Sequence, residues 1–307
     1  MLYRKILLIS SIVACAFALD VPENKIVDTK WLKENIDDRN LVLVDLRDDK
    51  GGAFIPGAID WHVDDFREYR FDIKGFVASP IQFERLIQQS GITDDKTIVF
   101  YSEGNKSATD YIGTTSAVYV SEVYGLKNTA ILNGGYAAWI KDGGKTAPNA
   151  KKPAKSEFKI TEVNSDLVAT VYDIDNAVVT GDWILMDGRS DSHFKGETAH
   201  SNAAKNGHIR DAHSVFIGKF VEKKDGIFYM KTDKSSVVNL INSAGGDVTK
   251  PTIWYCNAGF FATGGWFMSK YTAGTENVTV YDGSMFEYSR LPKREVLKSE
   301  PEVAPAQ

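Results

Sequence analysis

The sequence predicts an α/β protein built from two tandem domains, each with a mainly parallel sheet flanked by helices. Short apolar runs alternate along the chain with segments of helical period, which is the pattern of parallel strands joined by crossover helices. Four motifs also occur twice in the same order, and 307 residues are enough for two domains.

The repeat consists of apolar, strand-like runs and the turns that follow them. The paired segments are 41–47 with 183–189, 54–58 with 207–212, 98–102 with 253–256, and 132–135 with 281–284. In the first pair both copies end in Asp-x-Arg, at Arg47 and Arg189. This duplication predicts a pseudo-symmetric molecule with domains at residues 24–141 and 166–297.

Helix signals lie between these runs. Ser79, Pro80 and Gln82 have the types expected at the N-cap, the first helical position and the capping-box position, and the pattern ends near Gly91. Residues 235–244, followed by two glycines, predict a corresponding helix in the second half.

Two further segments differ in character from the domains. Residues 142–165 are rich in lysine and contain proline, as is typical of a linker, and residues 298–307 are expected to form a disordered tail.

Residues 1–18 predict a signal peptide. Arg4 and Lys5 precede an apolar stretch, and Ala16 and Ala18 form a small-residue cleavage site. We therefore expect a periplasmic or secreted protein; the alternative is lipid attachment at Cys15, because residues 12–15 resemble a lipoprotein box. The apolar stretch is too short to span a membrane. Cleavage would change the net charge from -5 to -7, because Arg4 and Lys5 are lost.

Cys256 is the most informative residue. Cleavage after Ala18 leaves it as the single cysteine, so it cannot form an internal disulfide. It follows the apolar run 252–255 and opens a short loop before a helical segment. The N–H groups of such a loop and of a helix N-terminus favour an anionic sulfur, so we expect a thiolate populated at neutral pH. The alternative is a buried structural cysteine.

Composition and spacing exclude several classes of function. The chain is 43% hydrophobic and 25% charged, as in soluble globular proteins, and its acidic balance without a basic stripe argues against a nucleic-acid partner. Neither a metal nor another cofactor is expected, because no His or Cys run has metal-ligand spacing. A phosphatase-type Cys-x5-Arg loop is excluded because Ala262 stands where the phosphate-binding Arg would be.

The sequence resembles the tandem rhodanese sulfurtransferases in four motifs. They are the Asp-x-Arg strand ends, the Gly-His-Ile turn at 207–209, the strand ending at Cys256 and the Tyr-Asp-Gly-Ser segment at 281–284. The resemblance covers residues 25–296. It implies two rhodanese-like domains, of which the first, with Ser102 in the cysteine position, is non-catalytic. It also implies that Cys256 takes a sulfane sulfur as a persulfide from mercaptopyruvate, polysulfide or thiosulfate. The acceptor would be cyanide or a thiol, which can belong to a protein.

The candidate site has two parts. The persulfide loop comprises Cys256, Asn257, Ala258, Gly259, Phe260 and Phe261, and the candidate substrate-binding residues are Arg189, His193 and Arg210. Gly259 is expected to let the loop close tightly. The resemblance assigns an anionic donor to Arg189, for which the alternative is an ion pair with Asp187 or Asp191. His193, in place of a second Arg, would hold an anion only weakly or only when protonated.

For Arg210, for the sulfur donor and for the overall function, the sequence leaves alternatives open. Arg210 either reaches the mouth of the pocket or is a solvated surface residue, and His208 is expected to be a turn or core histidine bonded to the backbone. Thiosulfate enzymes of the family typically carry Arg and Lys where Asn257 and Ala258 stand, so the uncharged loop disfavours a free dianion. The competing function is that of an exported sulfur carrier that delivers persulfide sulfur to a partner protein with little turnover. A degenerate, purely structural tandem domain is a third alternative.

Overall fold

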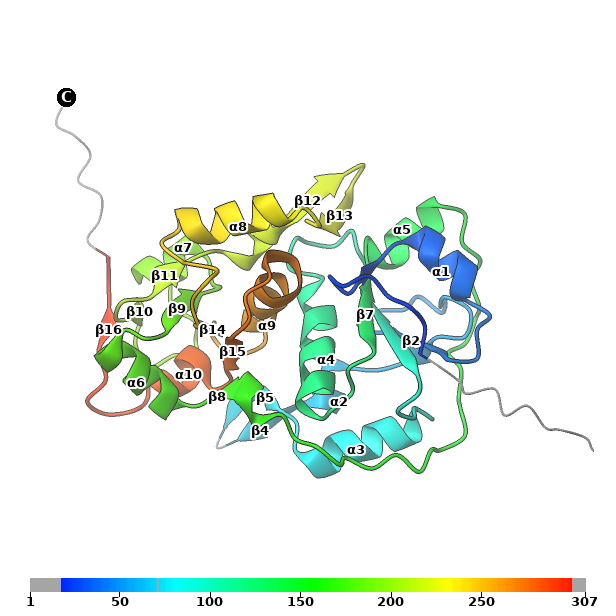
Figure 1. Ribbon diagram of the computed structural model, residues 1–307, viewed down its shortest axis with the longest axis horizontal. Coiled ribbons are helices and arrows are strands. Elements are labelled where there is room, and N and C mark those ends of the chain that lie inside the picture. Colours follow the sequence, from blue (N-terminus) through cyan, green and yellow to red (C-terminus); the bar gives the residue numbers. More distant parts are fainter. Residues whose placement is uncertain (1–17, 71, 300–307) are drawn as a thin grey trace, which may run out of the picture.

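The computed structural model describes residues 18–70 and 72–299, and its two halves lie side by side (Figure 1). Most of the predicted signal peptide and residues 300–307 of the predicted tail lie outside the described residues. The elements of the first half are β1 (Ile26–Val27), α1 (Thr29–Asn35), β2 (Leu41–Asp45), β3 (Ile59–Asp60), α2 (Val63–Phe66), β4 (Arg67–Arg70), β5 (Ile73–Val77), α3 (Pro80–Gln89), β6 (Thr97–Tyr101), α4 (Ile112–Val123), β7 (Thr129–Leu132) and α5 (Gly135–Lys141).

The second half follows the same plan with additional short elements. They are η1 (Ser165–Leu167), β8 (Val168–Ala169), α6 (Val171–Thr180), β9 (Ile184–Asp187), α7 (Asp191–Lys195), β10 (His208–Ile209), β11 (His213–Ser214), η2 (Ile217–Phe220), β12 (Val221–Lys224), β13 (Ile227–Met230), α8 (Lys234–Ser243), β14 (Thr252–Tyr255), α9 (Ala262–Phe267), η3 (Met268–Ala273, a π-helical segment), β15 (Val278–Tyr281), α10 (Ser284–Tyr288) and β16 (Val296–Leu297).

Each half contains a five-stranded sheet in which all neighbouring strands are parallel. The order is β1-β7-β6-β2-β3 in the first half and β8-β15-β14-β9-β11 in the second, so corresponding strands occupy corresponding places. The register also repeats, because Asp45 pairs with Tyr101 and Asp187 with Tyr255. The predicted α/β class and the tandem repeat are therefore confirmed.

The predicted helix signals are present. The Ser79 hydroxyl accepts a hydrogen bond from the backbone N–H of Gln82 at the start of α3, and the chain turns at Gly91, which has a φ of 65°. In the second half α8 begins after Asp233, whose carboxylate accepts from the Ser236 N–H. That helix starts one residue earlier than the sequence suggested, because Asp233 provides the cap.

The core is continuous between the two halves. Helices α4 and α9 pack side by side in the middle of the molecule (Figure 1), and almost every side chain on both is buried. Tyr119 and Trp266 meet edge to face with ring centroids 5.0 Å apart, and the hydroxyls of Thr115 and Thr263 lie 3.1 Å from each other. Two helices that are buried on nearly all sides must be covered on nearly all sides, so each half completes the core of the other.

Each half also extends a two-stranded hairpin onto the other. The β4–β5 hairpin ends at Val77, whose N–H donates to the Asp282 carboxylate at 2.8 Å. The β12–β13 hairpin ends at Met230, whose N–H donates to the Asn133 amide oxygen, also at 2.8 Å. Asn133 and Asp282 are equivalent in the repeat, so the exchange of hairpins is pseudo-symmetric.

The predicted linker at residues 142–165 runs as a strap along the first half (Figure 1). Its backbone bonds to Phe54 through Ala147, the Ser156 N–H donates to the Gln88 carbonyl at 2.9 Å, and Phe158 is buried in the core. The strap is therefore part of the first half's folded structure.

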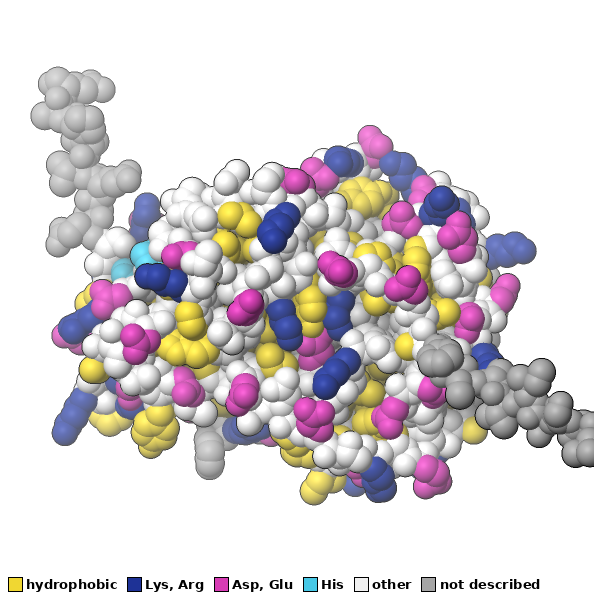
Figure 2. All heavy atoms as spheres, viewed as in Figure 1, with side chains coloured by type: hydrophobic (Ala, Val, Ile, Leu, Met, Phe, Trp, Pro, Cys, Tyr) yellow, Lys and Arg dark blue, Asp and Glu magenta, His cyan; other side chains and the backbone are white. Residues whose placement is uncertain are grey.

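The surface has no single-signed stripe on the face drawn in Figure 2, where basic and acidic side chains are interspersed. Within residues 18–70 and 72–299, no helix is long and apolar enough to cross a membrane. No cluster of potential metal ligands occurs in that same part of the chain.

Candidate active site

The site is centred on Cys256, directly after the middle strand of the second sheet. Strand β14 lies between β9 and β15, and the chain turns through residues 256–261 before α9 begins at Ala262. The carboxyl ends of parallel strands form the crevice in which such sheets bind ligands. Cys256 is only 2% exposed, so its sulfur lies at the bottom of that crevice.

Ser284 holds the loop in shape. Its hydroxyl oxygen accepts hydrogen bonds from the N–H of Cys256 at 3.1 Å and the N–H of Gly259 at 2.9 Å, and its proton goes to the Tyr281 carbonyl. Gly259 has a φ of 70°, and a Cβ at that position would lie 2.4 Å from the carbonyl oxygen of Asp282. Only glycine fits there without a shift of the backbone.

The backbone N–H groups of Ala258, Phe261 and Ala262 surround the Cys256 sulfur electrostatically, because each favours its anionic form. Burial raises the pKa of the Cys256 thiol, and these N–H groups lower it by a smaller amount, so the pKa lies above the ordinary thiol value. The expectation of a thiolate populated at neutral pH is thus wrong for the resting site, because desolvation outweighs the loop donors. The same donors remain available to an anionic sulfur formed during a reaction.

A cleft of about 1000 Å³ opens above Cys256 between the two halves. The second half lines it with apolar, thiol, amide and imidazole side chains, which are His200, Asn202, Cys256, Asn257, Ala258, Phe260, Phe261 and Phe286 among the described residues. The first half supplies the charged residues of the described lining, which are Arg47, Asp48, Asp49, Lys50, Arg67, Glu103, Lys106 and Asp110. Their formal charges cancel, because four are basic and four are acidic.

Several of these charges are engaged in ion pairs. Lys50 lies 2.9 Å from Asp60, and Lys106 lies 3.8 Å from Asp48. Burial raises the pKa of both Glu103 and Asp110 above the ordinary carboxyl values. The cleft therefore has a polar, electrically balanced wall on one side and an apolar wall beside the thiol.

Arg189 does not line the cleft. Its guanidinium is buried and bonds to the Asp187 carboxylate at 2.6 Å and to the Gly207 carbonyl at 2.7 Å, which is the ion pair that the sequence left as the alternative. Arg47 forms the same pair with Asp45 in the half that has no cysteine. The pair is thus a repeated feature of the fold, and only Arg189 Nη1 faces the loop, 3.4 Å from the Asn257 amide oxygen.

His193 and Arg210 also lie outside the lining of the cleft. The His193 Nδ1 atom is 2.8 Å from the Ser190 hydroxyl, and burial and then the charge of Arg189 lower the pKa of its imidazole. Both effects favour the uncharged ring, which makes His193 a poor ligand for an anion. Arg210 is half exposed and pairs with Glu295, so the surface alternative holds for this residue.

The remaining histidine prediction is confirmed. His208 stacks on Phe194 with ring centroids 3.9 Å apart, and its Nδ1 lies 2.8 Å from the Phe194 carbonyl oxygen. It packs within its own half and is not among the residues that line the cleft.

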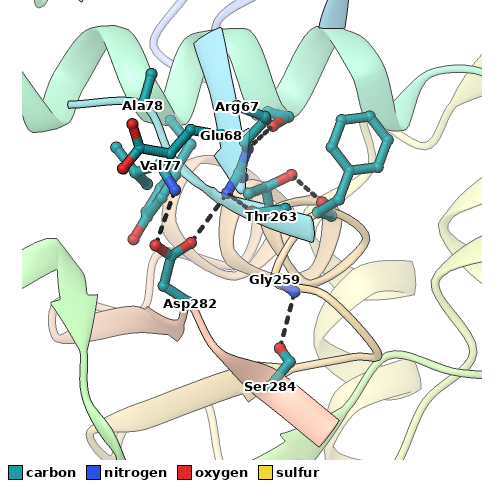
Figure 3. A network of polar contacts seen from close by, with 12 residues as sticks. Arg67, Glu68, Val77, Ala78, Gly259, Thr263, Asp282 and Ser284 are labelled. Atoms are coloured by element: carbon teal, nitrogen blue, oxygen red, sulfur yellow. Dashed lines mark hydrogen bonds and ion pairs between the residues drawn. The ribbon is translucent and has the colours of Figure 1, made fainter. Parts of the chain in front are cut away.

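Residues from the first half were missed by the sequence reasoning. Gly75, on the β4–β5 hairpin, approaches the loop so closely that a Cβ there would lie 2.3 Å from the Ala258 carbonyl oxygen. Arg67, on the same hairpin, forms a buried ion pair with Asp282 at 3.0 Å (Figure 3). No local sequence signal marks Arg67, because its partner is more than 200 positions away. Ser284 was part of a recognised motif, but the motif did not show that its hydroxyl supports the loop.

The fold and this site define a two-domain α/β protein with a cysteine cradled by backbone N–H groups after a central parallel strand. The rhodanese-like domain model matches residues 28–142 and 170–291. The chain belongs to the rhodanese family.

Proteins similar in sequence align over nearly the whole chain. A protein of Mycobacterium leprae that bears the name thiosulfate sulfurtransferase is 30% identical, and the alignment covers 87% of this chain and 95% of the relative. The sulfur carrier protein TtuD of Thermus thermophilus is 25% identical, with coverages of 90% and 97%.

Solved structures share the fold. SseA of Escherichia coli, a 3-mercaptopyruvate sulfurtransferase, superposes with a TM-score of 0.72 at 24% identity, covering 85% of this chain and 98% of its own. The anaerobic ergothioneine biosynthesis enzyme of Chlorobium limicola gives a TM-score of 0.77 at 20% identity, with coverages of 91% and 71%.

The buried position of Cys256 predicts its pH response. Alkylation by iodoacetamide should accelerate with rising pH, because the thiolate reacts, and the inflection should fall at higher pH in the folded protein than in the protein unfolded in denaturant. The rate can be followed at the Cys256 peptide by mass spectrometry. An inflection at lower pH in the folded protein would show that the loop donors outweigh burial.

Proposed function

We propose that this protein is a rhodanese-type sulfurtransferase that carries a sulfane sulfur as a persulfide on Cys256. One observation carries the proposal: the thiol lies at the bottom of a cleft of about 1000 Å³, and the backbone N–H groups of Ala258, Phe261 and Ala262 favour an anionic form of its sulfur. Such a ring of fixed donors stabilises negative charge without a titrating base. The cysteine is therefore placed both to attack a donor and to hold the product.

The reaction has two displacements. In the first, the Cys256 thiol loses its proton to water, and the thiolate attacks the transferable sulfur of the donor. A new S–S bond forms, and the bond that joined that sulfur to the rest of the donor breaks. The remainder of the donor leaves with the electron pair, as sulfite from thiosulfate or as the enolate of pyruvate from mercaptopyruvate. In the second, an acceptor thiolate or cyanide attacks the outer sulfur of the persulfide, and the Cys256 thiolate is released.

The charge balance of the cleft favours donors that carry a single negative charge. The four basic and four acidic residues of the described lining cancel formally, so a dianion meets no excess positive potential. A dianion that enters beside Phe260 and Phe261 exchanges part of its hydration shell for apolar surface. Burying a charge without a partner raises the free energy of binding. Mercaptopyruvate, which carries one carboxylate, or a polysulfide that enters with one charged end is therefore the proposed donor, and thiosulfate a poor one.

A sulfur carrier is the second candidate, favoured by the similarity to TtuD over 90% of this chain. In that case the persulfide forms with free donor but is released only to a protein thiol. Turnover with cyanide or a small thiol separates the candidates, because a carrier would give a single equivalent of product.

We also propose that the protein is exported. Leu19, the first residue after the predicted cleavage site, is already held by the fold, since its N–H donates to the Thr97 hydroxyl at 2.8 Å. Mass spectrometry of the native protein is expected to give an N-terminus at Leu19. A lipid-modified Cys15 would instead place the protein on a membrane surface.

Removing the nucleophile tests the first proposal. Cys256→Ala is expected to abolish persulfide formation and transfer, with a change in unfolding free energy of about 1 kcal/mol. Both can be measured, by intact mass and by urea denaturation. Adding Ser102→Cys should not restore transfer, because the Gly104 N–H in that loop already donates to the Asp110 carboxylate at 2.6 Å. Transfer by Cys256→Ala would disprove the proposed role of this residue.

Donor preference can be shifted by adding charge to the loop. Ala258→Lys places a cation in the lining of the cleft and should raise the ratio of thiosulfate to mercaptopyruvate activity by about tenfold, the effect of one charged hydrogen bond. The ratio of kcat/KM values gives the measurement. Thr180→Lys, which adds the same charge on the exposed end of α6, is the matched control. Equal effects of both variants would mean that net charge, rather than the loop, sets the preference.

A further inference from the structure

The β4–β5 hairpin carries a charge that its counterpart in the repeat lacks. Arg67 pairs across this hairpin with Val77, whose N–H bonds to Asp282. In the other half the corresponding cross-strand pair is Val221 with Met230, and the acceptor of the Met230 N–H is the neutral Asn133. Of the two hairpins in the described structure, the one from the first half therefore makes a buried Arg–Asp pair with the other half, and the one from the second half does not.

Hydrogen bonds hold the Arg67 side chain in place, but one of its nitrogen donors has no acceptor. It is 3% exposed, its Nε donates to the Ser116 hydroxyl at 2.8 Å, and its Nη1 donates to the Gly75 carbonyl and the Asp282 carboxylate (Figure 3). Its Nη2 is buried and has no hydrogen-bond partner within the described chain. A buried charged donor without an acceptor is unfavourable, and a ligand that provides an acceptor removes this cost.

The same side chain lines the cleft that contains Cys256. The guanidinium carbon lies 5.9 Å from the centre of the Phe260 ring, so it is adjacent to the persulfide loop. Arg47, the other lining arginine, directs its Nη2 to Asp45 and the Ala53 carbonyl. Arg67 therefore combines a buried positive charge, a free N–H and a position beside the reactive loop.

We propose that Arg67 Nη2, contributed by the first half, binds the anionic group of the sulfur donor beside Cys256. This inference rests on the proposed function and extends it to the recognition of a carboxylate-bearing donor. One free nitrogen on an arginine whose charge is largely balanced by Asp282 suits a monoanion better than a dianion. The first half, which has no thiol of its own, would then determine which donor the second half uses.

The proposed role of Arg67 can be tested by measuring the binding of a carboxylate to a protein that cannot react. In the full-length Cys256→Ser protein, pyruvate, the carboxylate left after sulfur is removed from mercaptopyruvate, should bind in isothermal titration calorimetry. Arg67→Met combined with Asp282→Asn copies the neutral arrangement around Asn133 and avoids a buried unpaired carboxylate. This double variant should weaken pyruvate binding by about tenfold or more.

Two comparisons separate anion binding from a structural role. Asp282→Asn alone keeps the cation and should bind pyruvate as well as the parent or better. Arg294→Met with Asp175→Asn removes a surface Arg–carboxylate pair and should leave binding unchanged. If the parent does not bind pyruvate, if the Arg67 double variant binds it equally well, or if Asp282→Asn alone loses binding to the same extent, the inference is wrong.

A single variant provides the test if the Arg67 double variant does not fold. Arg67→Lys retains the charge beside Asp282 but removes the guanidinium fork, so it should weaken pyruvate binding while thermal unfolding remains cooperative. Undiminished binding in that variant would contradict the proposal. Persulfide formation by the unmodified protein is measured separately, so a failure of the proposed function can be distinguished from a failure of this site.

Discussion

The packing of α4 against α9 is the contact on which the rest of the structure depends. Both helices are buried on nearly all sides, and Tyr119 and Trp266 make the contact dense at its centre. This contact brings the carboxyl edges of the two sheets to a common cleft, and it allows each hairpin to reach the loop region of the other half. A site formed by one half alone would lack the β4–β5 hairpin that presses on Ala258.

Duplication has left the two halves with different tasks. The second half provides the cysteine, the N–H groups around its sulfur and an apolar wall, whereas the first half provides the charged lining in the described part of the cleft. The paired Asp45 and Arg47 show that the scaffold itself did not diverge at that position, because Asp187 and Arg189 make the same contacts. The halves differ instead at Ser102 against Cys256, at Asn133 against Asp282 and at Val221 against Arg67.

The sequence was sufficient for features that depend on local pattern. Alternating strands and helices, the repeated Asp-x-Arg ends and the loop after β14 all follow from short-range spacing, and the structure contains them. It was insufficient where contacts join distant segments. Nothing near Arg67 indicates that Asp282 will be its partner, and nothing near Arg189 shows whether its guanidinium faces a ligand or the preceding carboxylate. The protonation of Cys256 depends on burial, which spacing alone does not report.

The strap at residues 142–165 bears on whether either half can fold without the other. It is not a free tether, because Ser156 and Phe158 fasten it to the first half before the chain enters the second. A cut within it would therefore leave two fragments still joined by α4, α9 and the crossed hairpins, whereas synthesis of the second half alone would expose the apolar face of α9. Loss of the half without a cysteine during evolution would expose the same face, so the packing of α4 against α9 favours retention of both halves.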